Sequence, residues 1–353
     1  MGNAHSSALA GRSGQAEILS DLPSVVYKQS LGGGQLLKSS LCIHDEIGLV
    51  VVKQTYPKQN LGEIKKYEED LLEIKSRLSS LASPHSLPVT HIQDSGSSVF
   101  LLRQYAHSNL LARLGARPFL RAADKLWISY QLLVAGRQLE ALRTAHGDIK
   151  ASNVLLTSWG WVLLADFAPY KPHHLPPDNP ASFSLFFDTA GKRTCCVAPE
   201  RFRDRAAGGV VKEPSAPAGA LGSSTPASDV FSLGCVVAEL YLDGRPLFDY
   251  SSLLAYRTGA LEEPNLLRSL PAEVRALVAR MIARDPKQRP SCAALLNGPE
   301  GRAMFPDWMA DVVHPFFARL LRIPPDAAAG IVLDQWEGLL EELGGKGRRE
   351  RGR

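Results

Sequence analysis

The sequence predicts an α+β chain with two lobes, a small β-rich lobe over residues 21–106 and a larger α-helical lobe over residues 107–320. Short runs rich in β-branched residues, such as 48–53 and 99–102, are separated by glycine and acidic turns in the first part. Later stretches such as 121–144 instead place apolar residues at helical spacing. We expect residues 1–20 to be flexible, and residues 321–353 to form a helix at 331–343 followed by a basic tail.

Composition excludes several classes of protein. With 353 residues, 45% of them hydrophobic and 22% charged, the chain can bury a full core as one large domain or two small ones. A net charge of +4 does not indicate a nucleic-acid partner, and we expect none. The five cysteines include no Cys-x-x-Cys pair, which is typical of reduced, intracellular thiols. No apolar run approaches the roughly 18 residues of a membrane span, so we expect a soluble chain unless something anchors it.

The strongest chemical signal is the segment His146–Asn153 together with a second carboxylate, Asp166. Phosphoryl transfer from a nucleotide needs such a set. Asp148 would accept the hydroxyl proton, Lys150 would stabilise the transferring charge, and Asn153 and Asp166 would hold Mg²⁺ on the phosphates of ATP or GTP. The alternative is a chance Asp-x-x-x-x-Asn in a turn.

The first lobe offers a place for those phosphates. A strand, a glycine cluster at 31–37 and a further strand predict a hairpin whose backbone N–H groups cover phosphates. Gly32 and Gly34 fit the first two positions of Gly-x-Gly-x-x-Gly, but Leu37 occupies the third, so a plain hairpin is the alternative. Lys53 ends a run of three valines, where a lysine either reaches the phosphates or faces water.

The order of the motifs along the chain resembles the protein-kinase fold, and Lys150 resembles the serine/threonine class. That resemblance implies a glutamate on the helix expected at 62–80 that pairs with Lys53. Glu73 fits best and Glu69 is the alternative. The hinge that contacts the nucleotide base would be the segment from Arg103 to Ala106, with Gln104 and Ala106 as its binding residues.

The same resemblance assigns structural roles in the second lobe. Asp229 would hydrogen-bond the backbone of the catalytic loop, and Arg289 would form a buried ion pair with Glu200 of Ala198-Pro199-Glu200. The proline-rich stretch 167–180 predicts an irregular surface loop, and the Ala-, Gly-, Pro- and Ser-rich stretch 206–227 predicts an insert.

A narrower resemblance rests on the segment 157–168, with its Trp-x-Trp and its Ala168, and on the motifs that follow it up to Cys195. These residues resemble the kinase-like regulatory subunit of the class III phosphatidylinositol 3-kinase complex, the vacuolar protein sorting complex. The resemblance implies two kinds of partner, the catalytic subunit of that lipid kinase and its autophagy and vacuolar-sorting co-subunits. It also implies a location in the cytoplasm and on endosomal, Golgi or autophagosomal membranes. Such proteins continue into helical repeats and a β-propeller, so we expect this chain to be a fragment or a short form.

The first residues predict a lipid anchor. Met1-Gly2-Asn3-Ala4-His5-Ser6 fits the N-myristoylation pattern, with Gly2 as the acylated residue. The alternative is a disordered start that begins with Met-Gly. A single myristoyl chain binds membrane only marginally, so a second contact is needed, from a partner or from the basic tail at 346–353.

Three departures from the kinase pattern predict weak or restricted phosphotransfer. Gly147 replaces the arginine that reads activation-loop phosphorylation, Ala168 replaces a glycine, and Leu37 replaces the third loop glycine. We therefore expect a nucleotide-binding, mainly regulatory serine/threonine kinase domain. The alternatives are a nucleotide-free pseudokinase scaffold and an independent soluble serine/threonine kinase.

Overall fold

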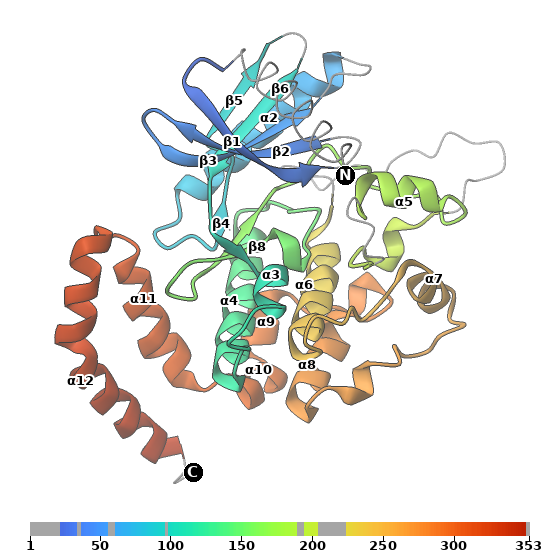
Figure 1. The fold of residues 1–353 in the computed structure, drawn as a ribbon. Helices are drawn as coiled ribbons and strands as arrows, with labels where there is room; N and C mark the ends of the chain where they lie inside the picture. The colour runs from blue at the N-terminus through green and yellow to red at the C-terminus, as the bar shows by residue number, and fades with distance from the viewer. Residues whose placement is uncertain are drawn as a thin grey trace, which may run out of the picture.

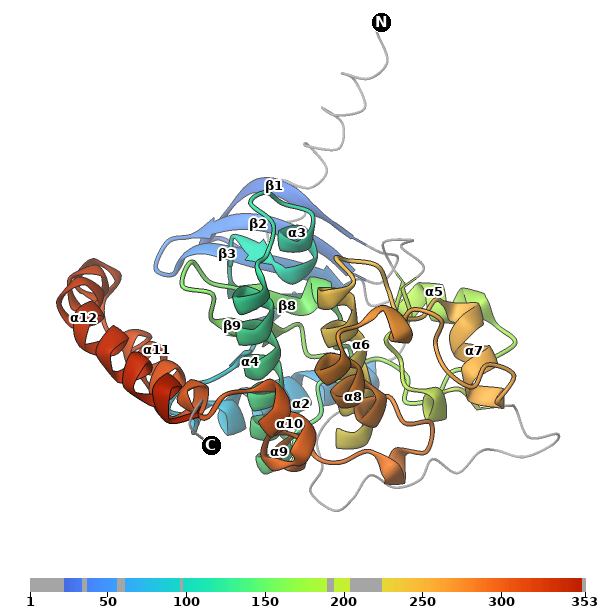
Figure 2. The same ribbon diagram turned by 90° about the horizontal axis from the view of Figure 1, so that it is seen from below.

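The computed structural model describes residues 22–33, 37–55, 61–95, 98–188, 194–203 and 224–350. They form a strand-rich lobe, a helical lobe and a pair of helices packed outside the helical lobe (Figures 1 and 2). The predicted α+β class and its two lobes are confirmed. Gly2 and Gly34 lie outside the described residues, as does most of the insert predicted at 206–227.

The first lobe is built on one antiparallel sheet. Its strands lie in the order β1 (Val25–Gly33), β2 (Leu37–His44), β3 (Gly48–Thr55), β6 (Val99–Gln104) and β5 (His91–Asp94). Side chains alternate between the two faces of a strand. In β3, Val50 and Val52 therefore enter the lobe's core, whereas Val51 and Lys53 line a cleft below the sheet. The valine run thus decides that Lys53 points into the cleft.

Helix α2 (Leu61–Ser79) crosses this lobe and confirms the helix predicted at 62–80. Its buried face contains Leu71, Ile74 and Leu78, at three- and four-residue spacing. In its last turn, Arg77 donates to the carbonyl oxygens of Leu142 and Arg143, at 3.1 and 2.9 Å. The end of α2 is therefore attached to the helical lobe.

The loop after α2, residues 80–85, is bonded along its length to the helical lobe. Gln138 donates to the Ser83 carbonyl at 2.9 Å and accepts from the His85 amide at 2.9 Å. The Trp161 indole donates to the Pro84 carbonyl at 3.1 Å and stacks on the His85 ring. These bonds fix α2 relative to the lobe below it.

A second, smaller sheet lies between the first lobe and the helices. Its order is β4 (Ser86–Leu87), β9 (Val162–Ala165), β8 (Val154–Leu156) and β7 (Ser108–Asn109), with β4 parallel to β9 and the other pairs antiparallel. The 3-10 turn η2 (Ala151–Asn153) leads into β8, and Asp166 directly follows β9. Because β8 and β9 are adjacent, this sheet brings the catalytic segment and Asp166 together.

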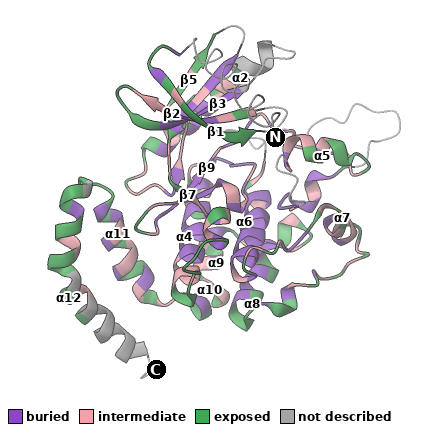
Figure 3. Ribbon diagram, in the orientation of Figure 1, coloured by how far each residue is buried: buried purple, intermediate pink, exposed green. Residues whose placement is uncertain are grey.

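The helical lobe packs around two buried helices, α4 (Ala122–Ala141) and α6 (Pro226–Tyr241), which are largely purple in Figure 3. A Cβ at Gly136 of α4 would overlap Cys292 Sγ, so this glycine permits α4 to approach its neighbour closely. The remaining α-helices of the lobe are α3 (Leu110–Leu114), α5 (Pro180–Phe186), α7 (Tyr250–Thr258), α8 (Ala272–Met281), α9 (Cys292–Asn297) and α10 (Pro299–Met304). The remaining 3-10 turns are η3 (Pro199–Arg201), η4 (Leu267–Ser269) and η5 (Pro286–Gln288).

The chain then leaves the lobe through the π-helical turn η6 (Met309–Val313) into α11 (His314–Leu320) and α12 (Pro325–Glu350). These two helices pack on each other through a small core containing Phe316, Leu320 and Ala328. Arg322 donates to the Ala82 carbonyl at 3.1 Å, and His314 Nε2 lies 2.9 Å from His85 Nε2. The helix predicted at 331–343 is the middle part of α12, which is longer. Among the described residues, no helix is long and apolar enough to cross a membrane.

The stretch predicted to be an irregular surface loop, 167–180, is irregular, but only its last three residues, 178–180, are exposed. Ala168, Lys171 and Leu175 are all buried. For residues 167–177 the predicted surface position was wrong because it used composition alone, whereas Tyr170 and Lys171 line the cleft. The stretch ends in the short helix α5, whose N-cap Asn179 accepts from the Ser182 amide.

Candidate active site

A cleft of about 670 Å³ separates the two lobes. The first sheet contributes Gly32, Leu37, Val51 and Lys53 to its lining, and the second lobe contributes residues 147–153 and Asp166. The segment after Asp166 and helix α5 close one side. The sequence-predicted residues Asp148, Lys150, Asn153, Lys53 and Asp166 therefore meet in one cavity.

The catalytic segment is held from below by Asp229, in the first turn of α6. The Asp229 carboxylate accepts from the backbone amides of His146 and Gly147, at 2.6 and 3.1 Å, as the sequence predicts. Gly147 has φ +80°, a conformation that side chains other than glycine rarely adopt. The His146 ring bonds the Ala165 carbonyl at 2.9 Å and contacts Phe167. The two carboxylate-bearing segments are thus fixed to each other.

Asp148 is almost enclosed by donors of the same chain. Its Oδ2 lies 2.6 Å from Lys171 Nζ, 3.0 Å from Lys150 Nζ and 2.9 Å from Asn153 Nδ2. Burial alone would raise the pKa of Asp148, but the charges of Lys150 and Lys171 outweigh it and hold that pKa below its usual value. Burial in turn lowers the pKa of Lys171 to about 8. Asp148 is therefore an ionised carboxylate already paired with two lysines.

Asp166 is paired in the same way with two other cations. It has φ +68°, and its Oδ2 lies 2.8 Å from Lys53 Nζ. Its Oδ1 accepts from Arg103 Nε at 2.8 Å, and Arg103 Nη2 lies 3.4 Å from Oδ2. Burial would raise the pKa of Asp166, but Lys53 and Arg103 lower it well below its usual range. Both oxygens of this carboxylate thus have a cationic partner within the chain.

The expected partner of Lys53 was wrong, because Lys53 pairs with Asp166 and Glu73 pairs with Arg77 one turn along α2. The reason is the phase of the helix. Glu73 and Glu69 are exposed, whereas Leu71, Ile74 and Leu78 face inward. Among the glutamates of α2 whose side chains are described, Glu68 is half-buried and has a solvent-shielded carboxylate oxygen.

The predicted hinge is placed only in part as expected. Tyr105 and Ala106 line the cleft, but the Gln104 side chain is exposed. The backbone carbonyl oxygen of Gln104 accepts a hydrogen bond from Arg103 Nη1 at 3.2 Å. Gly32 lines the cleft with φ +96°, and Leu37 lines it at the position of the missing glycine.

Sequence reasoning missed two site residues, Lys171 and Arg201, and it placed Arg103 in the hinge without its contact to Asp166. Arg201 is buried and donates to the carbonyl oxygens of Gly147, Pro172 and His173, at 2.9, 2.8 and 3.2 Å. The ring of Phe187 lies under both Lys171 and Arg201. No sequence pattern marks these cations, because their role depends on the path that the chain takes after Asp166.

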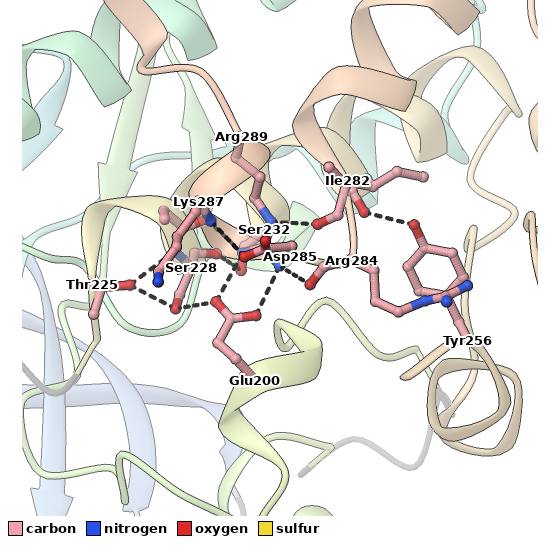
Figure 4. Close-up of polar contacts among 12 residues, drawn as sticks. Glu200, Thr225, Ser228, Ser232, Tyr256, Ile282, Arg284, Asp285, Lys287 and Arg289 are labelled. Atoms are coloured by element: carbon pink, nitrogen blue, oxygen red, sulfur yellow. Dashed lines mark hydrogen bonds and ion pairs between the residues drawn. The ribbon is translucent and has the colours of Figure 1, made fainter. Parts of the chain in front are cut away.

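The end of this segment is attached to the helical lobe by Glu200 and Arg289 (Figure 4). The two side chains form a bidentate ion pair with both contacts at 2.8 Å, as predicted. Ser228 donates to Glu200 at 2.8 Å, and Arg289 Nε donates to the Ala283 carbonyl at 2.7 Å. The Arg289 side chain has no solvent exposure, so the pair is buried on that side.

This fold and cleft define the class of protein, and comparison with known sequences agrees: the protein kinase domain model matches residues 25–299. The chain belongs to the protein kinase family.

Within that family the chain is similar to proteins named serine/threonine-protein kinase VPS15. It is 40% identical over 329 residues to the one from Arabidopsis thaliana, which covers 92% of this chain and 21% of the relative. It is 34% identical over 309 residues to the one from Saccharomyces cerevisiae, covering 85% of this chain and 20% of the relative. The chain thus spans about a fifth of the length of these relatives.

Protein kinase domains use ATP and Mg²⁺ in general, and this cleft has the ligand types for the ion, although both Asp166 oxygens already have a cationic partner. A carboxylate and an amide oxygen are ligands that Mg²⁺ accepts, and Asp166 and Asn153 supply one of each. The Asn153 amide nitrogen donates to Asp148, which leaves its amide oxygen for a ligand. Among the described residues, no group of three or more His, Cys, Asp or Glu side chains forms a separate metal cluster.

Proposed function

We propose that this chain is a nucleotide-binding serine/threonine kinase domain whose phosphotransfer is restricted and whose main role is regulatory. The observation that carries the proposal is the state of Asp148. The complete set of catalytic residue types lines one cleft, but the carboxylate that would accept the substrate proton is already bound by Lys150 and Lys171.

In this proposal Lys53 binds the nucleotide phosphates, Lys150 stabilises charge on the transferred group, and Asp148 orients the substrate hydroxyl and accepts its proton. In the family pattern Mg²⁺ on Asp166 and Asn153 would neutralise phosphate charge, whereas in this cleft Lys53 and Arg103 already bind Asp166. A general base must come within hydrogen-bonding distance of the proton that it removes. Lys150 and Lys171 on Oδ2 hold the carboxylate ionised and lower its affinity for the hydroxyl proton, and that effect restricts the reaction.

The test is phosphate transfer from labelled ATP or GTP to the chain itself and to a general substrate such as casein. We expect slow transfer by the wild type and a fall of about 100-fold or more in Asp148→Asn, which keeps the shape but not the base. Equal rates in the two proteins would assign the activity to a contaminant. Absence of nucleotide binding to the wild type would favour the scaffold alternative.

The wider role is also part of this proposal: the chain anchors and regulates a class III phosphatidylinositol 3-kinase on endosomal or autophagic membranes through Gly2 myristoylation. Its support is the motif resemblance and the likeness to proteins named VPS15. Co-expression with the lipid kinase catalytic subunit and an N-myristoyltransferase tests it. Wild type should co-purify with the subunit and float with vesicles, and Gly2→Ala should keep the first property and lose the second.

A further inference from the structure

Arg103 occupies an unusual position for a buried cation. It lies on β6, opposite Val51 of β3, so its side chain enters the cleft from the roof beside Lys53. All three guanidinium nitrogens have a partner, two of them on Asp166 and the third on the Gln104 carbonyl. The guanidinium therefore connects the hinge to the carboxylate that the family pattern assigns to metal.

The two cations beside Asp166 already outnumber its single negative charge, so no unneutralised negative charge remains there to attract a metal ion. One carboxylate faces Lys53 and Arg103, and their side chains are 18% and 11% exposed. Mg²⁺ demands near-ideal octahedral geometry and must take at least one of these oxygens. It would have to displace a charge-assisted contact at 2.8 Å, or share an oxygen with the cation that already binds it, and in either case it would lie beside that cation. A phosphate group, in contrast, meets two cations already aimed at one place, one of them an arginine with its bidentate geometry.

We propose that Arg103 takes the place of a divalent cation at Asp166, so that nucleotide phosphates bind this cleft without magnesium and Asp166 accepts a divalent ion only when Arg103 is removed. The proposal rests on the proposed nucleotide-binding function and adds the ionic form of the ligand. It makes Arg103 a specificity-determining residue, because it decides between free nucleotide and its magnesium complex.

The first test titrates a fluorescent ATP analogue (mant-ATP) and mant-GTP against the full chain, at matched ionic strength, in EDTA and in excess MgCl₂. For wild type we expect dissociation constants that agree within about threefold in the two conditions. For Arg103→Met, which keeps the volume and removes the charge, we expect binding that is about tenfold or more tighter with magnesium than without it. Arg103→Lys keeps a cation and should stay close to wild type.

The second test does not need nucleotide. Free Mn²⁺ is measured by its electron paramagnetic resonance signal, with protein added and no nucleotide present. Arg103→Met should bind Mn²⁺ about tenfold or more tightly than wild type. Lys171→Met is the matched control, because it removes one positive charge from the same cleft but leaves both partners of Asp166 in place.

Two results would overturn the inference. One is wild-type nucleotide binding that is lost in EDTA, and the other is an equal gain in Mn²⁺ affinity in Arg103→Met and Lys171→Met. If wild type binds neither nucleotide in either condition, the proposed function fails at nucleotide binding, and the part of the inference that concerns phosphates fails with it. The Mn²⁺ measurement still decides whether Arg103 blocks Asp166. Circular dichroism on each variant verifies that the protein compared is folded.

Discussion

Two arginine–carboxylate clusters of this chain differ in their balance of charge. Glu200 and Arg289 form a one-to-one bidentate pair that joins the end of the activation segment to the helical lobe (Figure 4). Asp166 instead faces two cations, Arg103 and Lys53, at the edge of an open cleft. A balanced pair needs nothing more, whereas a carboxylate with a surplus of cations leaves positive charge for an anionic ligand. The comparison separates a contact that stabilises the fold from one that prepares a site.

The largest expected effect comes from breaking the balanced pair. Arg289→Ala leaves Glu200 without its cation, and Glu200→Gln leaves a fully buried guanidinium uncompensated. Each change should lower the free energy of unfolding by about 3–5 kcal/mol, measured by urea denaturation. In a double-mutant cycle, the double variant should lose clearly less than the sum of the two single changes. Additive losses would show that the pair is not coupled.

A second expected effect extends the comparison to a buried polar pair that carries no charge. His85 Nδ1 lies 2.8 Å from the Val162 carbonyl, so Nδ1 carries the proton and Nε2 accepts from His314. Burial lowers the pKa of His85 to about 3 and that of His314 to about 4, from a usual value of 6.5. Below pH 6.5 the unfolded chain therefore binds more protons than the native one, and stability falls as the pH falls.

From pH 7 to pH 5, the His85 ring alone should reduce the free energy of unfolding by about 2 kcal/mol. The measurement is urea denaturation at several pH values, on wild type and on His85→Asn. Because carboxylates elsewhere titrate in both proteins, the difference between the two curves isolates the ring. Parallel curves would contradict a buried neutral histidine.

The smallest expected effect is at Asp148, the second carboxylate of the cleft that faces two cations. Lys171→Met leaves Asp148 paired with Lys150 and places an apolar side chain against Phe187. We expect the free energy of unfolding to change by less than about 1 kcal/mol, because a redundant buried cation contributes little net stability. Thermal denaturation checks this value. A loss as large as that in Arg289→Ala would mean that Lys171 is a structural cation, and the contrast between the clusters would not hold.

The same contrast explains what the sequence could predict. The Glu200–Arg289 pair and the bonds from Asp229 to the catalytic segment were predicted because each belongs to a fixed motif. Lys53 was placed correctly in the cleft because strand alternation after three valines decides its direction. The predicted partner of Lys53 was wrong, because its partner is Asp166, and because Glu73 and Glu69 lie on the exposed side of α2, a side that depends on the helix phase to within one residue.

The contacts of Arg103 and Lys171 could not be predicted, since neither residue belongs to a motif with a fixed partner, and their carboxylates lie 63 and 23 positions away along the chain. The sequence indicates Arg103 only as the first residue of the hinge, and Lys171 only as one polar residue in a proline-rich stretch. Their roles exist only once the two lobes close on each other. Local pattern therefore identified the acids of this site and two of their cations, Lys53 and Lys150, whereas tertiary structure alone identified the contacts of Arg103 and Lys171.

The bonds of the 80–85 loop have a mechanical consequence. His314, the first residue of α11, contacts His85 of this loop, and Arg322, which follows α11, donates to the Ala82 carbonyl. The same short segment is bonded to Gln138 and follows the last turn of α2. A load applied to the C-terminal helices is thus carried by one six-residue stretch directly to the helix that forms the back of the first lobe. Displacing those helices as a rigid body requires breaking these bonds or moving α2 with them.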